Sequence, residues 1–272
     1  GIAGCVITAG CDLSAGRMIG FGACISGMLL QRMDYSGKFF PDMQPLNVFV
    51  VALIAMLVCA AFGTVTGFFI AYLNVPPFIA TLAMMEIVYG IGLIVTNATP
   101  LGGYVEQYTN VSNGKFLGIN YLIWIAIIVA AITWFIFNMT RHGKYMYAIG
   151  GNPQAAEVAG VPVKATLILI YMKAAAMYGL AGFMLGAKAG GASVQTGYGY
   201  EMEAIAACTI GGVSVTGGRG KVSSAIIGVA VFELLKVALQ YLGMNANAQY
   251  IAIGVVIFIA ISLDIRKYIA RK

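Results

Sequence analysis

The sequence contains few charged residues and one histidine, and these two shortages exclude whole classes of protein. Of the 272 residues, 10% are charged and 60% are hydrophobic, whereas a soluble domain carries about a quarter charged residues. The single histidine, His142, has no carboxylate near it in the sequence. This excludes the HExxH zinc motif and leaves no histidine base for a serine protease. We therefore predict an integral membrane protein that is not an enzyme.

Nucleotide-binding motifs and paired cysteines are also missing. Residues 215–222 superficially resemble a phosphate-binding loop, but valine stands where a Walker A motif needs its first glycine and its final serine or threonine. The five cysteines form no CxxC pair and lie within or beside apolar runs. That pattern favours packed free thiols over disulfides or metal ligands. We expect no metal and no cofactor in this chain.

Long hydrophobic runs make up most of what is present, and they predict an all-α polytopic membrane protein. A membrane-crossing helix needs about 20 apolar residues. Nine crossings are expected, in a single transmembrane domain over 1–272, and the first is apparently cut short. They cover residues 1–11, 16–33, 46–73, 78–96, 120–139, 165–187, 203–216, 222–241 and 249–264.

The distribution of charge predicts the orientation of these crossings. Loops enriched in lysine and arginine stay in the cytoplasm, so the more basic face and the C-terminus are predicted to be cytoplasmic. The net charge of +6 then needs no nucleic-acid partner. The cytoplasmic face carries Arg17, Arg141, Lys144, Lys164, Arg219, Lys221, Arg266, Lys267, Arg271 and Lys272 against Asp12, Glu157 and Asp264. The outer face carries Arg32, Lys38, Lys115 and Lys188 against Asp34, Asp42, Glu106, Glu201 and Glu203.

The start of the chain suggests that a further helix precedes it. Nine crossings would leave residue 1 outside, and the chain opens inside an apolar run without an initiator methionine. One more helix upstream would bring the N-terminus inside. We therefore expect ten helices in the full protein.

Residues 97–119 form the largest connection predicted on the outer, periplasmic face. They are polar and aromatic rather than charged. Two interpretations remain open: a solvated connection, or a docking surface or lid over the mouth of a pathway.

Residues 149–161 are the longest stretch that is unsuited to a lipid-facing helix. The sequence Gly-Gly-Asn-Pro at 150–153 predicts a turn. A short helix over 154–159 should follow, with Asn152 as its N-cap, the proline at its first position and Gly160 at its end. A short capped helix between two apolar runs indicates a surface that contacts another molecule.

Four ionisable residues lie deep in predicted crossings: Glu86, Lys173, Glu233 and Lys236. Each such charge is unfavourable by about 2.5 to 3.5 kcal/mol, so these residues should pair or line a watery cavity. Glu233 and Lys236 are three residues apart and can pair on one helix face. Glu86 and Lys173 lie at similar depth, about 12 Å above the cytoplasmic starts of their helices, and we predict an interhelical ion pair between them. The alternative is a proton or ion relay, as in a secondary transporter.

Small residues produce two further patterns. Residues 10–17 and 212–219 form a weak internal repeat, which is common in transporters, although chance similarity of Gly- and Ala-rich helices remains an alternative. Glycines also recur at GxxxG spacing, which allows helices to approach closely within one chain or across a dimer. These glycines are Gly16 and Gly20, Gly63 and Gly67, and Gly182, Gly186 and Gly190.

Four stretches together resemble the permease subunits of bacterial ABC importers of the branched-chain amino acid/ribose type. They are DLSAG at 12–16, AYLNV at 71–75, AIGGNP at 148–153 and YEMEAIAAC at 200–208. Residues 241–245, 249–251 and 263–264 are similar too, so the resemblance covers the whole chain and lacks only the family's N-terminal helix. Within the family, the similarity is greatest to the galactose/methyl-galactoside permeases.

The resemblance implies a homodimeric permease of the bacterial inner membrane that moves a monosaccharide, galactose or methyl-galactoside. Two cytoplasmic ATPase subunits, which bind the ATP and Mg, and a periplasmic sugar-binding protein would be its partners. In such proteins the loop corresponding to 140–164 carries a coupling helix that enters a groove on the ATPase. The residues implicated here are Gly150, Gly151, Asn152, Pro153, Ala155, Ala156, Glu157, Gly160 and Val161. A bulky residue at Gly151 or Ala156 should then abolish ATPase association without disturbing the fold.

A neutral sugar needs hydroxyls, amides and aromatic faces along its path rather than buried charge. Candidates are polar residues in or beside apolar runs, although each is equally compatible with a packed or backbone-bonded side chain. They are Ser14, Asn74, Thr81, Thr209 and Ser214. Ribose, xylose or a nucleoside remain alternative cargoes, and an ion-coupled carrier that uses Glu86 and Lys173 is the alternative mechanism.

Overall fold

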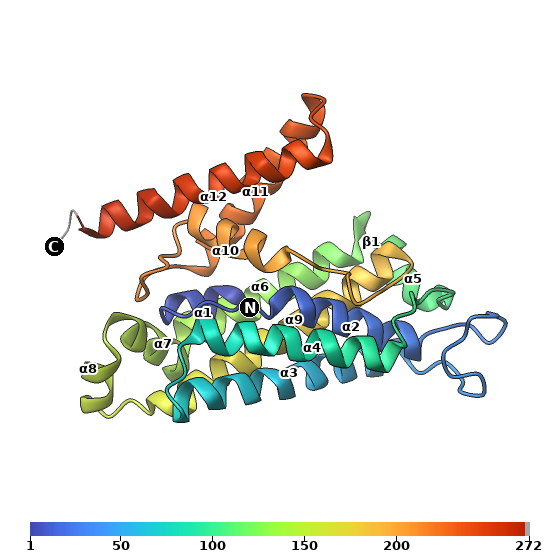
Figure 1. The fold of residues 1–272 in the computed structure, drawn as a ribbon, viewed down its shortest axis with the longest axis horizontal. Helices are drawn as coiled ribbons and strands as arrows, with labels where there is room; N and C mark the ends of the chain where they lie inside the picture. The colour runs from blue at the N-terminus through green and yellow to red at the C-terminus, as the bar shows by residue number, and fades with distance from the viewer. Residues whose placement is uncertain (270–272) are drawn as a thin grey trace. The chain divides into compact units, whose positions relative to one another are not determined.

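The computed structural model describes residues 1–269, without the side chains of 246, 263–265 and 267–269. Of the charge count, the side chains of Asp264 and Lys267 and the whole of Arg271 and Lys272 therefore lie outside what the structure describes. The described residues are mostly helical, and their only named strands form one hairpin, as Figure 1 shows. The helices are α1 (Ile2–Ile7), α2 (Ala15–Leu29), α3 (Val48–Tyr72), α4 (Pro77–Thr96), α5 (Glu106–Asn113), α6 (Tyr121–Met139), α7 (Arg141–Gly151), α8 (Pro153–Val158), α9 (Val163–Ala189), α10 (Tyr200–Ile210), α11 (Val222–Tyr241) and α12 (Ala246–Ile269). The hairpin pairs β1 (Lys115–Phe116) with β2 (Ile119–Asn120) in antiparallel fashion.

Within the described residues, five helices are long and apolar enough to cross a membrane: α3, α4, α6, α9 and α11. Each of the nine predicted crossings coincides with a helix, but the count of nine is not confirmed. With 6 residues, α1 is about 9 Å long, and with 11 residues α10 is about 17 Å long. Neither can cross a hydrocarbon core of about 30 Å alone. The all-α polytopic architecture holds, and these two elements are partial helices.

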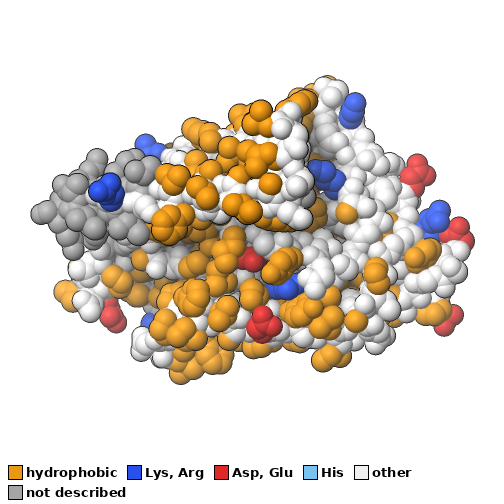
Figure 2. Space-filling model, turned by 45° about the horizontal axis from the view of Figure 1, so that its top comes forward, with side chains coloured by type: hydrophobic (Ala, Val, Ile, Leu, Met, Phe, Trp, Pro, Cys, Tyr) orange, Lys and Arg blue, Asp and Glu red, His pale blue; other side chains and the backbone are white. Residues whose placement is uncertain are grey.

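Hydrophobic side chains cover much of the face drawn in Figure 2, with few charged ones among them. Several of the long helices expose large apolar side chains, such as Phe49 at 84%, Ile94 at 78% and Phe135 at 57%. Exposed aromatic and aliphatic side chains on this scale suit contact with lipid tails or with another apolar surface.

The chain divides into two compact units, and each is described by itself. The first comprises residue 1, residues 12–131 and residues 167–201; the second comprises residues 2–11, residues 132–166 and the chain from 202 onward.

Glycines set the packing of the first unit. Gly63 and Gly67 of α3 lie against the α9 backbone at Tyr171 and Ile168, and Gly182 of α9 lies against the α2 backbone. A Cβ at any of these positions would collide with backbone atoms. The GxxxG spacings at 63–67 and 182–186 therefore serve packing within the chain, the first of the two alternatives.

The segment 190–199 corrects the predicted topology. Expected as part of an outer connection, it instead runs along α2 as a series of turns. Ala192 pairs with Leu101 at one end, and further along the Thr196 and Gly197 carbonyls lie against Gly20 and Gly16 of α2. Hydrophobic runs could not reveal this, because a Gly-rich, turn-forming segment has no helical periodicity.

The structure contradicts the prediction that Arg17 and residues 188–202 lie on opposite faces of the membrane. Arg17 was placed on the cytoplasmic face and residues 188–202 on the outer face, yet Arg17 Nη1 donates a hydrogen bond of 3.1 Å to Val194 O. Glu201, also counted outside, is only 6% exposed and packs against Gly16. The positive-inside rule applies to charges in loops. It could not place these residues correctly because they lie within the packed unit.

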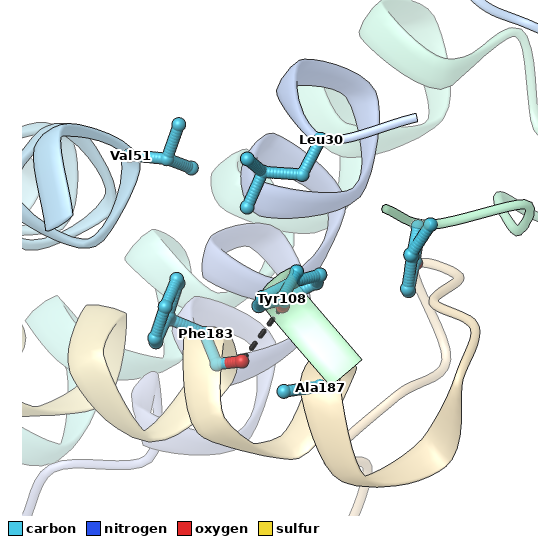
Figure 3. Close-up of a cluster of buried hydrophobic side chains, with 6 residues drawn as sticks. Leu30, Val51, Tyr108, Phe183 and Ala187 are labelled. Atoms are coloured by element: carbon cyan, nitrogen blue, oxygen red, sulfur yellow. Dashed lines mark hydrogen bonds between the residues drawn. The ribbon is translucent and has the colours of Figure 1, made fainter. Parts of the chain in front are cut away.

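The connection 97–119 is an ordered cap on the first unit. Tyr108 of α5 is fully buried and its hydroxyl donates a 2.7 Å hydrogen bond to Phe183 O of α9, as Figure 3 shows. Ser112 Oγ donates to Ala187 O at 3.0 Å, one turn further along α9. Burial raises the pKa of Tyr108 well above its usual value, so the phenol stays protonated. This cap is fixed to α9, and its role in docking or gating stays a prediction.

In the second unit, α10 packs closely against α11. Gly228 of α11 lies against the Ala207 carbonyl, and Gly211 lies against the Ser224 carbonyl. Ala206, Ala207, Phe232 and Ile253 form the apolar core where α10, α11 and α12 meet. Small residues thus allow the short α10 to pack closely on a full-length helix.

The weak sequence repeat has a structural counterpart. Helix α1 ends with Ala9 at φ +57° and a Gly10 N–H···O Cys5 hydrogen bond of 2.9 Å. Helix α10 ends with Gly212 at φ +95° and an equal 2.9 Å hydrogen bond from Val213 N to Cys208 O. Both endings are Schellman motifs.

A side-chain turn follows each of these endings. Ser14 N donates to Asp12 Oδ1 at 3.1 Å, and Thr216 N donates to Ser214 Oγ at 3.4 Å. These turns match in the predicted register, whereas the helix endings are shifted by one residue. The local similarity therefore extends over both the helix end and the turn.

Candidate functional site

The residues from 140 to 161 form two helices joined at one extended residue. Thr140 caps α7, because its Oγ1 accepts a 3.2 Å hydrogen bond from Gly143 N. Asn152 then separates α7 from α8 with φ −159° and ψ 106°, and its Oδ1 accepts a 3.0 Å hydrogen bond from Ala155 N. Proline follows at the first helical position, where it loses no helical hydrogen bond. The predicted N-cap of the short helix is confirmed.

The end of α8 also follows the prediction. Gly160 has φ +81°, and its N–H donates to Glu157 O, while Val161 N donates to Ala156 O, both at 3.0 Å. This is a Schellman ending, in which glycine occupies the left-handed position. The predicted turn at 150–153 needs a correction, because Gly150 and Gly151 are the last residues of α7 and only Asn152 leaves the helical conformation.

Gly150 is the point where three backbones meet. A Cβ on Gly150 would lie 2.5 Å from Gly218 N, 3.0 Å from the Ile7 carbonyl carbon and closer still to Ile7 O. Ile7 O itself accepts a 2.8 Å hydrogen bond from Gly218 N. The C-terminal end of α7 is therefore seated on the end of α1 and on the loop after α10. Sequence reasoning assigned this glycine to a turn and to the coupling loop, and did not indicate its contact with Ile7 and Gly218.

A second contact joins α7 to the same loop. The Tyr147 hydroxyl donates a 2.8 Å hydrogen bond to Gly220 O. Partial burial of the phenol raises the pKa of Tyr147 above its usual value. One turn of α7 thus contacts residues 217–220 at both Tyr147 and Gly150. No sequence pattern indicated this partner for Tyr147, because the two segments are more than 70 residues apart.

The short helix α8 projects its side chains outward. Gly151, Asn152, Pro153, Ala155, Glu157 and Gly160 are exposed, and Val158 is 91% exposed. Ala156 is the exception at 4%. The expectation that bulk at Ala156 leaves the fold intact is therefore wrong, since a larger side chain there would displace α8 from its own support. At Gly151 the space is open.

The five pathway candidates lie in varied environments. Ser14, Thr81, Thr209 and Ser214 are buried and hydrogen-bonded within the protein. Thr81 and Thr209 bond carbonyls of their own helices, and Ser14 bonds Asp12. Asn74 is exposed in the turn between α3 and α4, with φ +51°. Their role along a pathway stays a prediction.

The charged residues of the helices behave in two ways. Lys236 Nζ lies 3.4 Å from Glu233 Oε1, as predicted, and 2.9 Å from Glu203 Oε2 of α10. By contrast, no ion pair among the described residues joins Glu86 to Lys173, and Glu86 is exposed on α4. The predicted interhelical pair is wrong because helix rise gives the depth of a residue and not its direction around the axis.

Comparison with known proteins gives the family. The model described as "Branched-chain amino acid transport system / permease component" matches residues 1–261. The galactose/methyl galactoside import permease protein MglC of Escherichia coli (strain K12) is 41% identical over 100% of this chain and 83% of its own length. MglC of Treponema pallidum (strain Nichols) is 37% identical, over 100% and 54%. The ribose import permease protein RbsC of Escherichia coli (strain K12) is 32% identical, over 96% and 79%.

No solved structure matches the chain significantly. The family match covers nearly the whole sequence, and its members are permease components and not enzymes. The chain is thus a multi-pass protein of the bacterial inner membrane whose ATPase is a separate subunit. It belongs to the family of permease components of branched-chain amino acid transport systems, within the ABC importers.

Proposed function

We propose that this chain is the membrane subunit of an ATP-driven importer for a monosaccharide, galactose or methyl-galactoside. Two copies would form the permease, with two ATPase subunits on the cytoplasmic side, where the C-terminus also lies, and a sugar-binding protein outside. One observation carries the mechanism: the exposed, doubly capped helix α8 directly follows α7, whose Gly150 is seated on the end of α1 and on the loop after α10. The chain itself has no nucleotide motif, so the energy must enter through such a contact.

The geometry of α8 supports a role in transmitting force. Asn152 closes α7 and caps α8, so the two helices share a junction with little freedom to hinge. A displacement of α8 would pass along α7 to Ile7 and Gly218, whose hydrogen bond ties the end of α1 to the 217–220 loop. Because packed interfaces shift between discrete arrangements rather than deform smoothly, a small movement at α8 can reposition both partial helices.

The exposed face of α8 suits a groove on a partner protein. Its most exposed apolar side chain is Val158, and Glu157 lies beside it in sequence. An apolar residue that is 91% exposed on a helix projecting from its own support is a natural anchor for a protein interface.

The cargo is proposed from the relatives and from chemistry. The MglC proteins are named for galactose and methyl galactoside, and the RbsC proteins for ribose. A neutral sugar agrees with a chain in which few charged residues lie within long helices. Ribose, xylose and a nucleoside are the alternative cargoes of the same mechanism. An ion-coupled carrier that uses Glu86 and Lys173 has less support, since the family and the relatives are permease components of ABC importers.

The test is uptake by proteoliposomes that contain the purified chain, with and without its ATPase and binding protein. We expect galactose uptake only when ATP, the ATPase and the binding protein are all present. Competition with unlabelled ribose, xylose and nucleosides identifies the cargo. Uptake driven by a proton or sodium gradient in the absence of the ATPase would contradict the proposal.

A further inference from the structure

An arginine in the first unit contacts two tyrosine rings. Arg17 is in the first turn of α2, and its Cζ lies 4.1 Å from the ring centroid of Tyr89 on α4 and 4.7 Å from that of Tyr198. Its Nη1 donates to Val194 O at 3.1 Å and to Gln195 Oε1 at 3.0 Å. Gln195 Nε2 in turn donates to the Tyr89 hydroxyl at 3.0 Å. Three separate segments thus meet around one guanidinium.

The cluster lies far along α2 from the cap 97–119. Leu30, just after the end of α2, accepts a hydrogen bond from Val105 N in the cap 97–119. Arg17 is 13 residues before Leu30, which places it about 20 Å from that cap by helix rise. With the cap at the outer membrane surface, as predicted, this distance places Arg17 within a hydrocarbon layer of about 30 Å, where charged side chains mark pathways or sites.

The guanidinium is not neutralised by a carboxylate. Among the described residues, no acidic side chain lies within ion-pair distance of Arg17. Both of its hydrogen bonds come from Nη1, so Nε and Nη2 remain as donors in a fixed planar fork. The two tyrosine rings supply cation–π stabilisation without consuming these donors.

The cluster is also open. Tyr198 is 67% exposed, Gln195 is exposed and Arg17 is partly exposed. The open side therefore presents an aromatic ring, a primary amide and unused guanidinium donors together. A pyranose has C–H groups on its faces and hydroxyls around its rim, so it can stack on a ring while its hydroxyls accept from the guanidinium and bond the amide. A neutral sugar fits this set better than an anion, because no second base accompanies Arg17.

We propose that Arg17, Tyr89, Gln195 and Tyr198 form a site that contacts the sugar during its passage through the membrane. This inference rests on the proposed function. The site is lined by one turn of α2, one residue of α4 and the turn segment 190–199, and two of the three segments contact each other at Gly16 and Gly20. It holds the sugar weakly, since each group makes a single polar or stacking contact.

The test measures uptake of a set of sugars by proteoliposomes that contain the complete transporter with its ATPase and binding protein. The set is galactose and analogues that each lack one hydroxyl, every sugar at a concentration that saturates the binding protein. Because the binding protein is then fully occupied by each sugar, its own sugar preference does not affect the comparison of uptake rates. Variants are Arg17→Lys, which keeps the charge and loses the fork, and Tyr198→Leu, which removes an exposed ring. Arg266→Lys, an exposed base on α12, is the matched control.

We expect Arg17→Lys to slow galactose uptake about tenfold, while the analogue that lacks the contacted hydroxyl is slowed little further. The rate ratio between the two sugars then falls toward one. Tyr198→Leu should slow all pyranoses yet keep assembly with the ATPase, and Arg266→Lys should change nothing. If Arg17→Lys slows every sugar by one common factor, or if either variant has no effect, the inference is wrong. If Arg17→Lys does not assemble with the ATPase, the same ratio of uptake rates is measured with Gln195→Ala, for which we also expect a fall toward one. A wild-type complex that transports no sugar in the set would instead refute the proposed function.

Discussion

Replacing Gly150 by alanine should separate α7 from its support while leaving α8 itself unchanged. A Cβ at this position would lie 2.5 Å from Gly218 N and 3.0 Å from the Ile7 carbonyl carbon. These are backbone atoms, so they cannot turn aside as a flexible side chain could. The adjacent Gly151→Ala is the matched control, because nothing lies within 4 Å of a Cβ there.

The magnitude follows from two terms of similar size. Forcing a methyl group into a closed space costs about 1 to 3 kcal/mol. Weakening the 2.8 Å Gly218 N–H···O Ile7 hydrogen bond costs about 0.5 to 1.5 kcal/mol, and more if the groups stay buried without partners. The better helix propensity of alanine returns up to about 1 kcal/mol. We expect a net loss of about 2 to 3 kcal/mol at this junction for Gly150→Ala, and no loss or a slight gain for Gly151→Ala.

Amide hydrogen exchange on the purified protein in nanodiscs measures this directly. In Gly150→Ala, exchange at Gly218 should accelerate about 30-fold or more, as 2 kcal/mol implies, whereas Gly151→Ala should match the wild type. The ATPase should still bind Gly150→Ala, because the exposed face of α8 is unchanged, but transport should be lost. Gly151→Trp should do the reverse, folding normally and losing the ATPase. Wild-type exchange at Gly218 in Gly150→Ala would refute the argument.

Three further predictions concern single side chains. Asn152→Ala removes the N-cap of α8 and should destabilise that helix by about 1 kcal/mol, seen as faster exchange at the Ala155 amide and weaker ATPase binding; Asn152→Asp, which keeps an acceptor, should restore both. Tyr108→Phe removes the hydrogen bond to Phe183 O and should destabilise the cap 97–119 by about 1 kcal/mol, measured by limited proteolysis. Burial raises the pKa of Tyr108 in the folded protein. The stability difference between the wild type and the variant should therefore persist from neutral pH up to the pKa of the unfolded phenol, about 10, and shrink above it. Lys236→Met should lower the thermal stability by leaving Glu203 and Glu233 without their shared cation, and the double variant with Glu203→Gln should recover part of the loss; equal stability of all three proteins would contradict this.

Local chemistry in the sequence was a good guide to local structure. The N-cap at Asn152, the proline after it and Gly160 at the end of α8 all follow from short-range rules about backbone conformation and hydrogen bonding. Long apolar runs located every full-length helix, because a segment that crosses the hydrocarbon layer must be helical and about 20 residues long. The Glu233–Lys236 pair lies on a single helix and needed no tertiary information.

Short-range rules could not predict contacts between segments that are distant in the sequence. Nothing near Gly150 in the sequence indicates that Ile7 and Gly218 lie against it. The sequence did not indicate that the turn segment 190–199 runs along α2, because this route depends on Gly16 and Gly20, whose lack of side chains lets its carbonyls approach. Glu86 and Lys173 were matched by depth alone, although the rotation of each helix decides whether two side chains meet. The candidate site was therefore foreseen as a helix, and its connection to the rest of the chain was not.

The irregular backbone of the segment 190–199 bears on where water can enter the protein. Its turns leave peptide groups that are not bonded in a regular helix, although it lies alongside the apolar helix α2. Hydrocarbon cannot solvate such groups, so irregular backbone is tolerated only where protein buries it or a hydrated space reaches it. Because Gln195 and Tyr198 are exposed, we expect the second condition to apply here. This side of α2 should be the first part of the membrane interior to become hydrated, and a polar cargo would cross where the protein has already admitted water.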